Sequence, residues 1–223
     1  MTKRTKFGGT PSQASTRRPL RRLTIIVSAV VAAVLVAVAI ITLQRPPPAP
    51  LDLESGISLA QPRAVPEFAL LDQHGRPLTR AALKGRWTLL FAGFTHCPDI
   101  CPTTLTTLTA LAERLQDEGR ELQVLFLSLD PERDDPATLA PYLDYFNPGF
   151  IGATGDVAEI DRLMAALGLA YIQVPTGAET YTIDHSTALA LIDPRARVVA
   201  YFKPPLRDDA LAEDLLPVLA GAR

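Results

Sequence analysis

The sequence predicts an α/β domain in which helices flank a central mixed sheet, and three observations support this prediction. Residues 87–94 and 122–129 are almost wholly apolar, which suits strands that are buried on both faces. Helical patterns follow them, most clearly at 103–118, where leucines recur on one stripe. Two later apolar runs around a short polar turn indicate a hairpin, followed by a last helix. The order β-α-β-α, further helix, then β-β-α is that of the thioredoxin-like fold.

The residues before this domain predict a membrane anchor. Residues 1–22 contain seven basic residues and no acidic one, so we expect a cytoplasmic tail. Residues 23–43 have no charge and no proline, and their length matches the roughly 20 residues of a transmembrane helix. The positive-inside rule then predicts a single-pass protein of the inner (cytoplasmic) membrane, with the remainder facing the periplasm or the cell exterior. A cleaved signal peptide is the alternative, but the apolar run exceeds the usual signal core.

A linker and one domain are expected after the anchor. Residues 44–66 contain six prolines, which argue against a regular helix or a central strand. Residues 67–223 should then form a single domain. The chain has 22 basic and 24 acidic residues, and removal of the seven in the tail leaves 15 (22 less 7) basic residues. This acidic excess argues against a nucleic-acid partner.

Local signals predict the remaining elements of the domain. A strand at 68–72 and a turn at 73–76 precede a short helix at 78–84. A helix should begin in the acidic run at 134–136 and continue to about 146. Asp156 and Glu159 resemble a capping box that begins a helix ending at Gly168. Strands at 187–193 and 197–203 form the expected hairpin, and Pro217 should bend the helix at 208–220 or end it early.

The only two cysteines, Cys97 and Cys101, lie where the first buried strand gives way to a helix. Residues four apart share one face of a helical turn, so both sulfur atoms can point at one spot. A helix N-terminus also favours thiolate over thiol. The pair therefore predicts either two soft metal ligands or a reversible disulfide. Two small buried side chains without a chemical role are the alternative.

Among the histidines, His185 is the best candidate for a partner of this pair. It precedes the late hairpin, and loops at strand ends gather at the functional edge of such folds. His74 lies in a turn and should be exposed. His96 precedes Cys97 and is a minor candidate for the site, because its side chain points elsewhere if the two residues are extended. The acidic run at 130–136 more often starts a helix than binds a cation, although Asp130 could face the site.

With these residues placed, the chain resembles the SCO/SenC family of membrane-anchored copper proteins over about residues 65–220. The similar motifs are Thr-His-Cys-Pro-Asp-Ile-Cys-Pro at 95–102, Ser-Leu-Asp-Pro-Glu-Arg-Asp at 128–134 and Asp-His-Ser at 184–186. The resemblance implies a copper site made by Cys97, Cys101 and His185. We expect three carboxylates to support these ligands from beside the site: Asp99, Asp130 and Asp184. The late hairpin has Arg-Ala-Arg at 195–197 where the family often has a glycine, which affects only the turn type.

The resemblance also implies a copper chaperone, not an enzyme, that helps to build the binuclear copper centre of cytochrome c oxidase subunit II. Thiolates and imidazole suit copper(I) and copper(II), whereas a structural zinc site needs four protein ligands. A thiol–disulfide reductase that keeps the cysteines of that subunit reduced is the first alternative, but such enzymes use C-x-x-C. A thiol peroxidase is the second, but no arginine lies close to the cysteines in sequence. Other copper chaperones and a thiol reductant are further expected partners.

Overall fold

The computed structural model describes residues 17–43, 50–178 and 180–221. The chain divides into two units, Met1–Pro48 and Ala49–Arg223. In the first unit, α1 (Arg17–Leu43) is a helix of 27 residues. Among the described residues, no helix combines the length and the apolar character that a membrane crossing requires. The span at 23–43 therefore stays a prediction. Of the predicted tail at 1–22, residues 17–22 belong to α1, and residues 1–16 lie outside the described residues.

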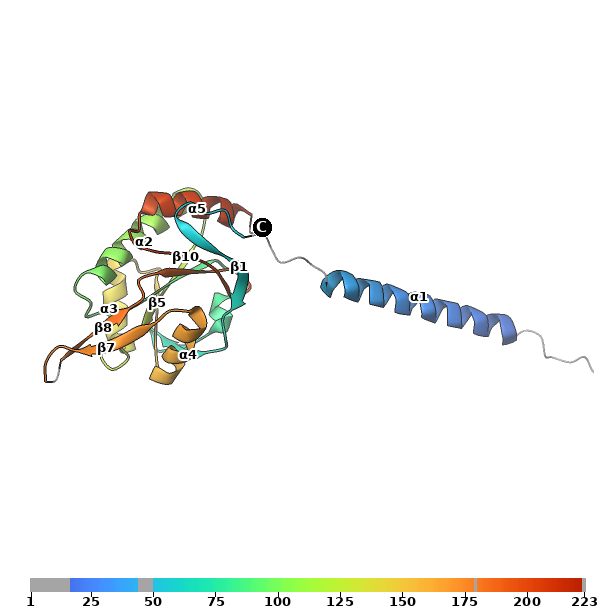
Figure 1. Cartoon of the computed structure of the whole chain (residues 1–223), viewed down its shortest axis with the longest axis horizontal. Helices are drawn as coiled ribbons and strands as arrows, with labels where there is room; N and C mark the ends of the chain where they lie inside the picture. The colour runs from blue at the N-terminus through green and yellow to red at the C-terminus, as the bar shows by residue number, and fades with distance from the viewer. Residues whose placement is uncertain (1–16, 44–49, 179, 222–223) are drawn as a thin grey trace, which may run out of the picture. The chain divides into compact units, whose positions relative to one another are not determined.

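The second unit contains an eight-stranded mixed sheet, as predicted (Figure 1). Its strands are β1 (Gly56–Ala64), β2 (Ala69–Asp72), β3 (Pro77–Thr79), β4 (Thr88–Gly93), β5 (Gln123–Ser128), β6 (Ile151–Thr154), β9 (Leu189–Ile192) and β10 (Arg197–Phe202). Their order in space is β1-β10-β9-β4-β5-β6-β2-β3. Strand β5 runs parallel to β4 and β6, whereas β9 pairs with β4 in the antiparallel sense.

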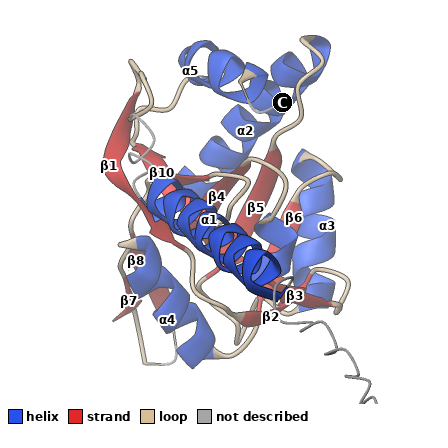
Figure 2. Ribbon diagram, turned by 90° about the vertical axis from the view of Figure 1, so that its right-hand side faces the viewer, coloured by secondary structure: helices blue, strands red, loops and turns tan. Residues whose placement is uncertain are grey.

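Helices flank the sheet (Figure 2), and each face of the sheet packs into its own apolar core. The helices are α2 (Ile100–Asp117), α3 (Pro136–Phe146), α4 (Val157–Leu167) and α5 (Asp208–Ala220), with a 3-10 helix η1 (Arg80–Leu83). Leucines of α2, α3 and α5 pack on one face, and α4 and η1 pack on the other. In β4, Leu89 and Phe91 join the first core, while Leu90 and Ala92 join the second. This alternation explains why the strand reads as a continuous apolar run.

Strand β1 corrects the predicted linker over 44–66. It pairs with β10 at the edge of the sheet, and the pairing shifts between Ser58 and Arg63. Pro62 lies inside this irregularity, and a proline without an N–H is tolerated at an edge strand or a bulge. The sheet therefore begins well before residue 67, the expected start of the domain. Residues 44–49 of the predicted linker are outside the described part of the chain.

The remaining predicted helices and strands agree with the structure except at short segments. The strand at 68–72, the strands at 87–94 and 122–129, the late hairpin and the helices are confirmed within a few residues. The short helix expected at 78–84 is instead strand β3 followed by η1. Pro217 lies inside α5 without ending it. Strand β6 and a second hairpin, β7 (Tyr171–Pro175) with β8 (Tyr181–His185), were not predicted.

Candidate metal centre

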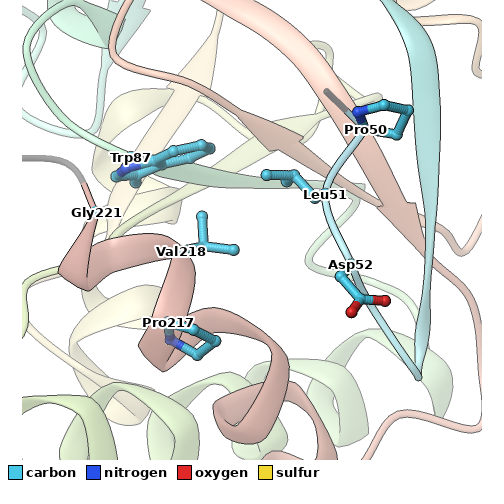
Figure 3. Close-up of a pocket in the computed structure, with 7 residues that line it drawn as sticks. All are labelled: Pro50, Leu51, Asp52, Trp87, Pro217, Val218 and Gly221. Carbon is cyan, nitrogen blue, oxygen red and sulfur yellow. The ribbon is translucent and has the colours of Figure 1, made fainter. Parts of the chain in front are cut away.

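A pocket near the end of α5 offers no metal-binding chemistry. Figure 3 shows this pocket, which has a volume of about 550 Å³ and is lined by seven residues that include Trp87 and Pro217. Asp52 is its one titratable lining residue, and neither cysteine nor histidine reaches it. The two cysteines lie elsewhere, where β4 is connected to α2.

Cys97 and Cys101 lie on this connection between β4 and α2. Cys101 is the second residue of α2 and is 0% exposed, whereas Cys97 is half-buried and touches both cores. The backbone N–H of Cys101 donates to Cys97 Sγ at 3.4 Å, so the first turn of the helix brings the sulfur atoms together. Both residues are free thiols, and their reversible disulfide stays a prediction.

Gly93, the last residue of β4, makes room for the buried thiol. A Cβ atom at this position would lie 2.8 Å from Cys101 Sγ and 3.1 Å from the Phe126 ring. Real Cβ atoms do not approach so closely, so only glycine fits here without displacing the sulfur. The sequence carried a signal for this residue, because a glycine interrupts the apolar run just before the cysteine motif.

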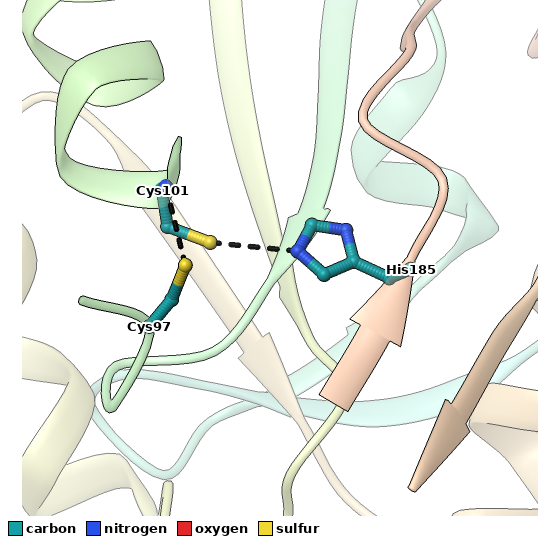
Figure 4. A group of neighbouring side chains, drawn as sticks. All are labelled: Cys97, Cys101 and His185. Carbon is teal, nitrogen blue, oxygen red and sulfur yellow. Dashed lines mark hydrogen bonds between the residues drawn. The ribbon is translucent and has the colours of Figure 1, made fainter. Parts of the chain in front are cut away.

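His185 is the last residue of β8, which corrects its predicted place in a loop before a hairpin. Its Nδ1 lies 3.0 Å from the backbone oxygen of Ser186. A carbonyl oxygen only accepts, so Nδ1 carries the proton and the lone pair of the neutral ring is on Nε2. Nε2 points at Cys101 Sγ at 3.6 Å (Figure 4). The ligand atoms of Cys97, Cys101 and His185 all lie within 4.8 Å of one another.

Burial controls the protonation of this group. Desolvation raises the pKa of Cys101 far above the usual thiol range, and the nearby Cys97 raises it further. The expected thiolate at the helix N-terminus is therefore wrong for Cys101 in the metal-free chain, because desolvation outweighs the helix dipole. Burial also lowers the pKa of His185, so its imidazole is neutral near pH 7. A metal ion that binds both groups must displace the thiol proton, and the neutral ring is ready to bind.

Asp99 and Asp184 lie at the mouth of the centre. Both are exposed, and they line a pocket of about 360 Å³ together with Cys97, His185 and Pro98. Asp99 is the N-cap residue of α2, but its side chain makes no capping hydrogen bond. The two carboxylates therefore surround the opening without joining the thiol and imidazole group.

A second group of close ligand atoms consists of His96, Asp130 and Asp134. The side chain of His96 is 53% exposed and lies 3.9 Å from Asp134, turned away from the thiols as expected. Asp134 accepts hydrogen bonds from Thr95 and Ser128, and Asp130 accepts from Tyr181 and Arg133. Carboxylates that are already saturated by protein donors favour a structural role. His74 is exposed in its turn, as predicted.

Comparisons with known proteins agree with this arrangement. The family model described as SCO1/SenC matches residues 58–220. A provisionally named copper-binding protein of Stutzerimonas stutzeri is 41% identical over 174 residues, which cover 78% of this chain and 85% of that protein. The mitochondrial SCO2 homologue of Bos taurus is 34% identical over 160 residues, which cover 70% of this chain but only 60% of that protein.

A solved structure supports the fold directly. The copper-bound ScoI of Arabidopsis thaliana superposes with a TM-score of 0.67 at 31% identity, covering 71% of this chain and 99% of that one. The predicted thioredoxin-like α/β fold is therefore confirmed for the second unit.

Proposed function

The chain belongs to the SCO1/SenC family, and from this premise we propose that it is a copper metallochaperone and not an enzyme. It delivers copper to the binuclear centre of cytochrome c oxidase subunit II. The observation that carries the proposal is the convergence of Cys97, Cys101 and His185 within 4.8 Å beside an open pocket. Copper is the cargo of this site.

The donor atoms suit copper in both oxidation states. Two soft sulfur ligands favour copper(I), and an imidazole nitrogen adds the kind of ligand that copper(II) prefers. The hydrogen bond from Nδ1 to the backbone oxygen of Ser186 aims the Nε2 lone pair at the thiols. In metal sites, the hydrogen bond made by the other ring nitrogen of a ligating histidine orients the ring in the same way. Three protein ligands leave a coordination position for a ligand from the receiving protein, whereas a structural zinc site is closed by four.

The pocket provides the route by which cargo enters and leaves. Cys97 lines it and is half-buried, while Cys101 lies beneath and is fully buried. Asp99 and Asp184 add negative charge to the opening, which attracts cations at low ionic strength. Copper would therefore meet Cys97 first and reach Cys101 last. A copper chaperone or a thiol reductant would dock at the same opening.

Segment 23–43 is proposed as the anchor that holds this domain at the inner membrane, facing the periplasm or the cell exterior. The segment has no charged residue, and the described apolar side chains of α1 between residues 25 and 38 are exposed. Apolar side chains exposed all around a helix are what lipid would cover. Alkaline phosphatase fused after Arg223 should be active in intact cells, and an inactive fusion would contradict the orientation.

A thiol–disulfide reductase is the second candidate, because the two thiols are adjacent. The hydrogen bond from the Cys101 N–H to Cys97 Sγ brings the sulfur atoms to one side of the first helical turn. The two sulfur atoms lie within 4.8 Å of each other, and a disulfide forms when the half-buried Cys97 side chain shortens this separation to about 2.05 Å. A reductase would not need His185, so the His185→Ala variant distinguishes the two functions.

Copper titration of the purified full-length chain tests the proposal. The reduced chain should bind one copper ion, and Cys97→Ser with Cys101→Ser should abolish this binding. The loaded chain should then pass copper to a metal-free soluble domain of subunit II. The visible absorption of the binuclear centre measures this transfer. A wild-type chain that binds no copper would refute the chaperone function, and binding without transfer would refute the named recipient.

A further inference from the structure

The hairpin that carries His185 is not part of the main sheet. β7 and β8 form a separate two-stranded sheet of the second unit, which lies beside the main sheet at the lower left of the domain in Figure 1. Side chains on a strand alternate between faces, so Tyr181, Ile183 and His185 share one face of β8. Ile183 is only 5% exposed and joins a core cluster, so this face packs on the domain. The position of His185 therefore depends on what holds the hairpin there.

Tyr181 makes a dense set of contacts with the loop that follows β5. Its hydroxyl donates to Asp130 Oδ1 at 2.7 Å, and its ring lies 3.9 Å from the guanidinium carbon of Arg133. Arg133 also donates to the backbone oxygen of Tyr181 at 3.4 Å and to Asp130 Oδ2 at 2.5 Å. We call Tyr181, Asp130 and Arg133 the Tyr181 cluster.

The chemistry of the cluster makes it a strong attachment. Asp130 is only 2% exposed, and its two oxygens accept from the two partners of the cluster. Burial, followed by the hydrogen bond to Asp130, raises the pKa of Tyr181 to about 12, so the phenol stays a donor at neutral pH. Hydrogen bonds in which one partner is charged are shorter and stronger than those between neutral groups. The guanidinium over the ring adds a cation–π contact.

The same loop also holds the thiol-bearing segment. Asp134 is fully buried and accepts from the Thr95 N–H at 3.0 Å and from its hydroxyl at 2.5 Å. Thr95 lies two residues before Cys97. Residues 130–134 therefore contact both ligand-bearing segments, the Cys97 loop through Asp134 and the hairpin through the Tyr181 cluster. One loop sets the two halves of the site relative to each other.

We propose that Tyr181 is a positioning residue for His185, and that the Tyr181 cluster sets the preference of the site for copper(II) over copper(I). This inference rests on the copper-binding function proposed above. Two thiolates suffice for copper(I), whereas copper(II) needs the imidazole nitrogen at the right separation. Loosening the hairpin moves His185 but leaves both thiols in place, so it weakens copper(II) selectively.

Two variants of the full-length chain test the inference. Tyr181→Phe removes only the hydroxyl donor, and Arg133→Lys keeps the charge but loses the flat stacking group. Tyr201→Phe is the matched control, because it removes a tyrosine hydroxyl that donates to Leu167, on a strand without ligands. Affinities for copper(I) and copper(II) are measured separately by competition, together with the reduction potential of the bound copper.

Tyr181→Phe should weaken copper(II) binding about tenfold, as the loss of a group that orients a ligand does. Copper(I) affinity should not change. This tenfold loss corresponds to a rise of about 59 mV in the potential for one electron. Arg133→Lys should shift the potential in the same direction, and Tyr201→Phe should not shift it.

Three outcomes would overturn the inference. Unchanged potentials in both variants would show that the cluster does not position His185, while wild-type copper binding would leave the proposed function intact. An equal loss of copper(I) and copper(II) affinity would show that Tyr181 supports the whole fold and not His185. A wild-type chain that binds neither ion would refute the proposed function itself.

Discussion

Cys101 belongs to the apolar core between the sheet and helices α2, α3 and α5, whereas His185 ends a hairpin outside the main sheet. Cys101 is packed on all sides, and Gly93 leaves the space that its sulfur atom fills, while Cys97 beside it is half-buried. The imidazole half is held by Ile183, by its ring contacts with Phe91 and Phe94, and by the polar Tyr181 cluster. Packed cores resist displacement, while a peripheral hairpin can shift at lower free-energy cost.

This difference suggests that the two halves of the site serve different oxidation states of copper. The two thiols, one buried and one half-buried, offer a soft site that does not depend on the hairpin and suits copper(I). The imidazole adds a third ligand. Its position depends on contacts between segments that are distant in sequence, such as Tyr181 and Asp130, which are 51 positions apart. Substitutions in the thiol half should therefore affect both oxidation states, and those in the imidazole half should affect copper(II) alone.

The largest expected effect is that of Cys101→Ser. The hydroxyl is a hard ligand, so copper(I) and copper(II) affinity should both fall more than about 100-fold, beyond the range for residues that only support a ligand. The sulfur-to-copper(II) absorption should weaken in parallel. Competition titrations and visible spectra measure this, with circular dichroism as the control for folding. A variant that loses only copper(II) would contradict the division between the halves.

His185→Ala should come next, with an effect confined to copper(II). We expect a loss of about 100-fold for copper(II) and little change for copper(I), because the two thiolates remain. The ring fills space between Phe91 and Phe94, so a modest loss of stability accompanies the change. His96→Ala is the matched control, since His96 is turned toward Asp134. If His96→Ala had the larger effect on copper(II), the ligand set would be wrong.

Much of the thiol half could be predicted from sequence, because its signals are local. The apolar run of β4, the leucine stripe of α2 and the spacing of Cys97 and Cys101 all lie within 35 residues. The raised pKa of Cys101 could not be predicted, because the packing that buries the thiol comes from distant segments. A helix N-terminus acts on a thiol only through the nearest backbone N–H groups, whereas desolvation depends on the whole core around it.

The imidazole half was predictable only in part, because the hairpin lacks a strong strand pattern. Strand β7 alternates poorly and remains largely exposed, so no apolar periodicity marks it. His185 was identified as a candidate, but its place at the end of β8 was not. The contact of Tyr181 with Asp130 spans 51 positions and leaves no trace in local composition. Strand β6 was missed for a related reason, since it has only four residues and includes a glycine.

Gly93→Ala should have a smaller effect than either ligand substitution, and it should act on both oxidation states. The new Cβ would lie 2.8 Å from Cys101 Sγ, so the sulfur or the helix start must move. We expect about a tenfold loss of affinity for copper(I) and copper(II) together, and a destabilisation of about 1–3 kcal/mol from overpacking. Gly149→Ala is the control, because only the Asn147 side chain lies near its Cβ position. Denaturant unfolding and competition titrations report the two effects, and a loss limited to copper(II) would contradict the prediction.

The smallest effect is expected at the mouth of the pocket. Asp99 is exposed there beside the thiols, and Asp184 is exposed beside His185. Asp184→Asn removes a charge near the opening without removing a ligand. The association rate of copper at low salt should therefore fall, by a factor of about three at most. The difference should vanish near 1 M salt, where the Debye length is about 3 Å. Asp117→Asn makes the same charge change at the far end of α2 and should leave the rate unchanged. Stability should stay within about 0.5 kcal/mol for both variants, because the side chains are exposed. A large loss of copper(II) affinity in Asp184→Asn would instead make this carboxylate a ligand, and the imidazole half would then extend beyond His185. Stopped-flow association at several salt concentrations distinguishes the two cases, since a lost ligand raises the dissociation rate at every ionic strength.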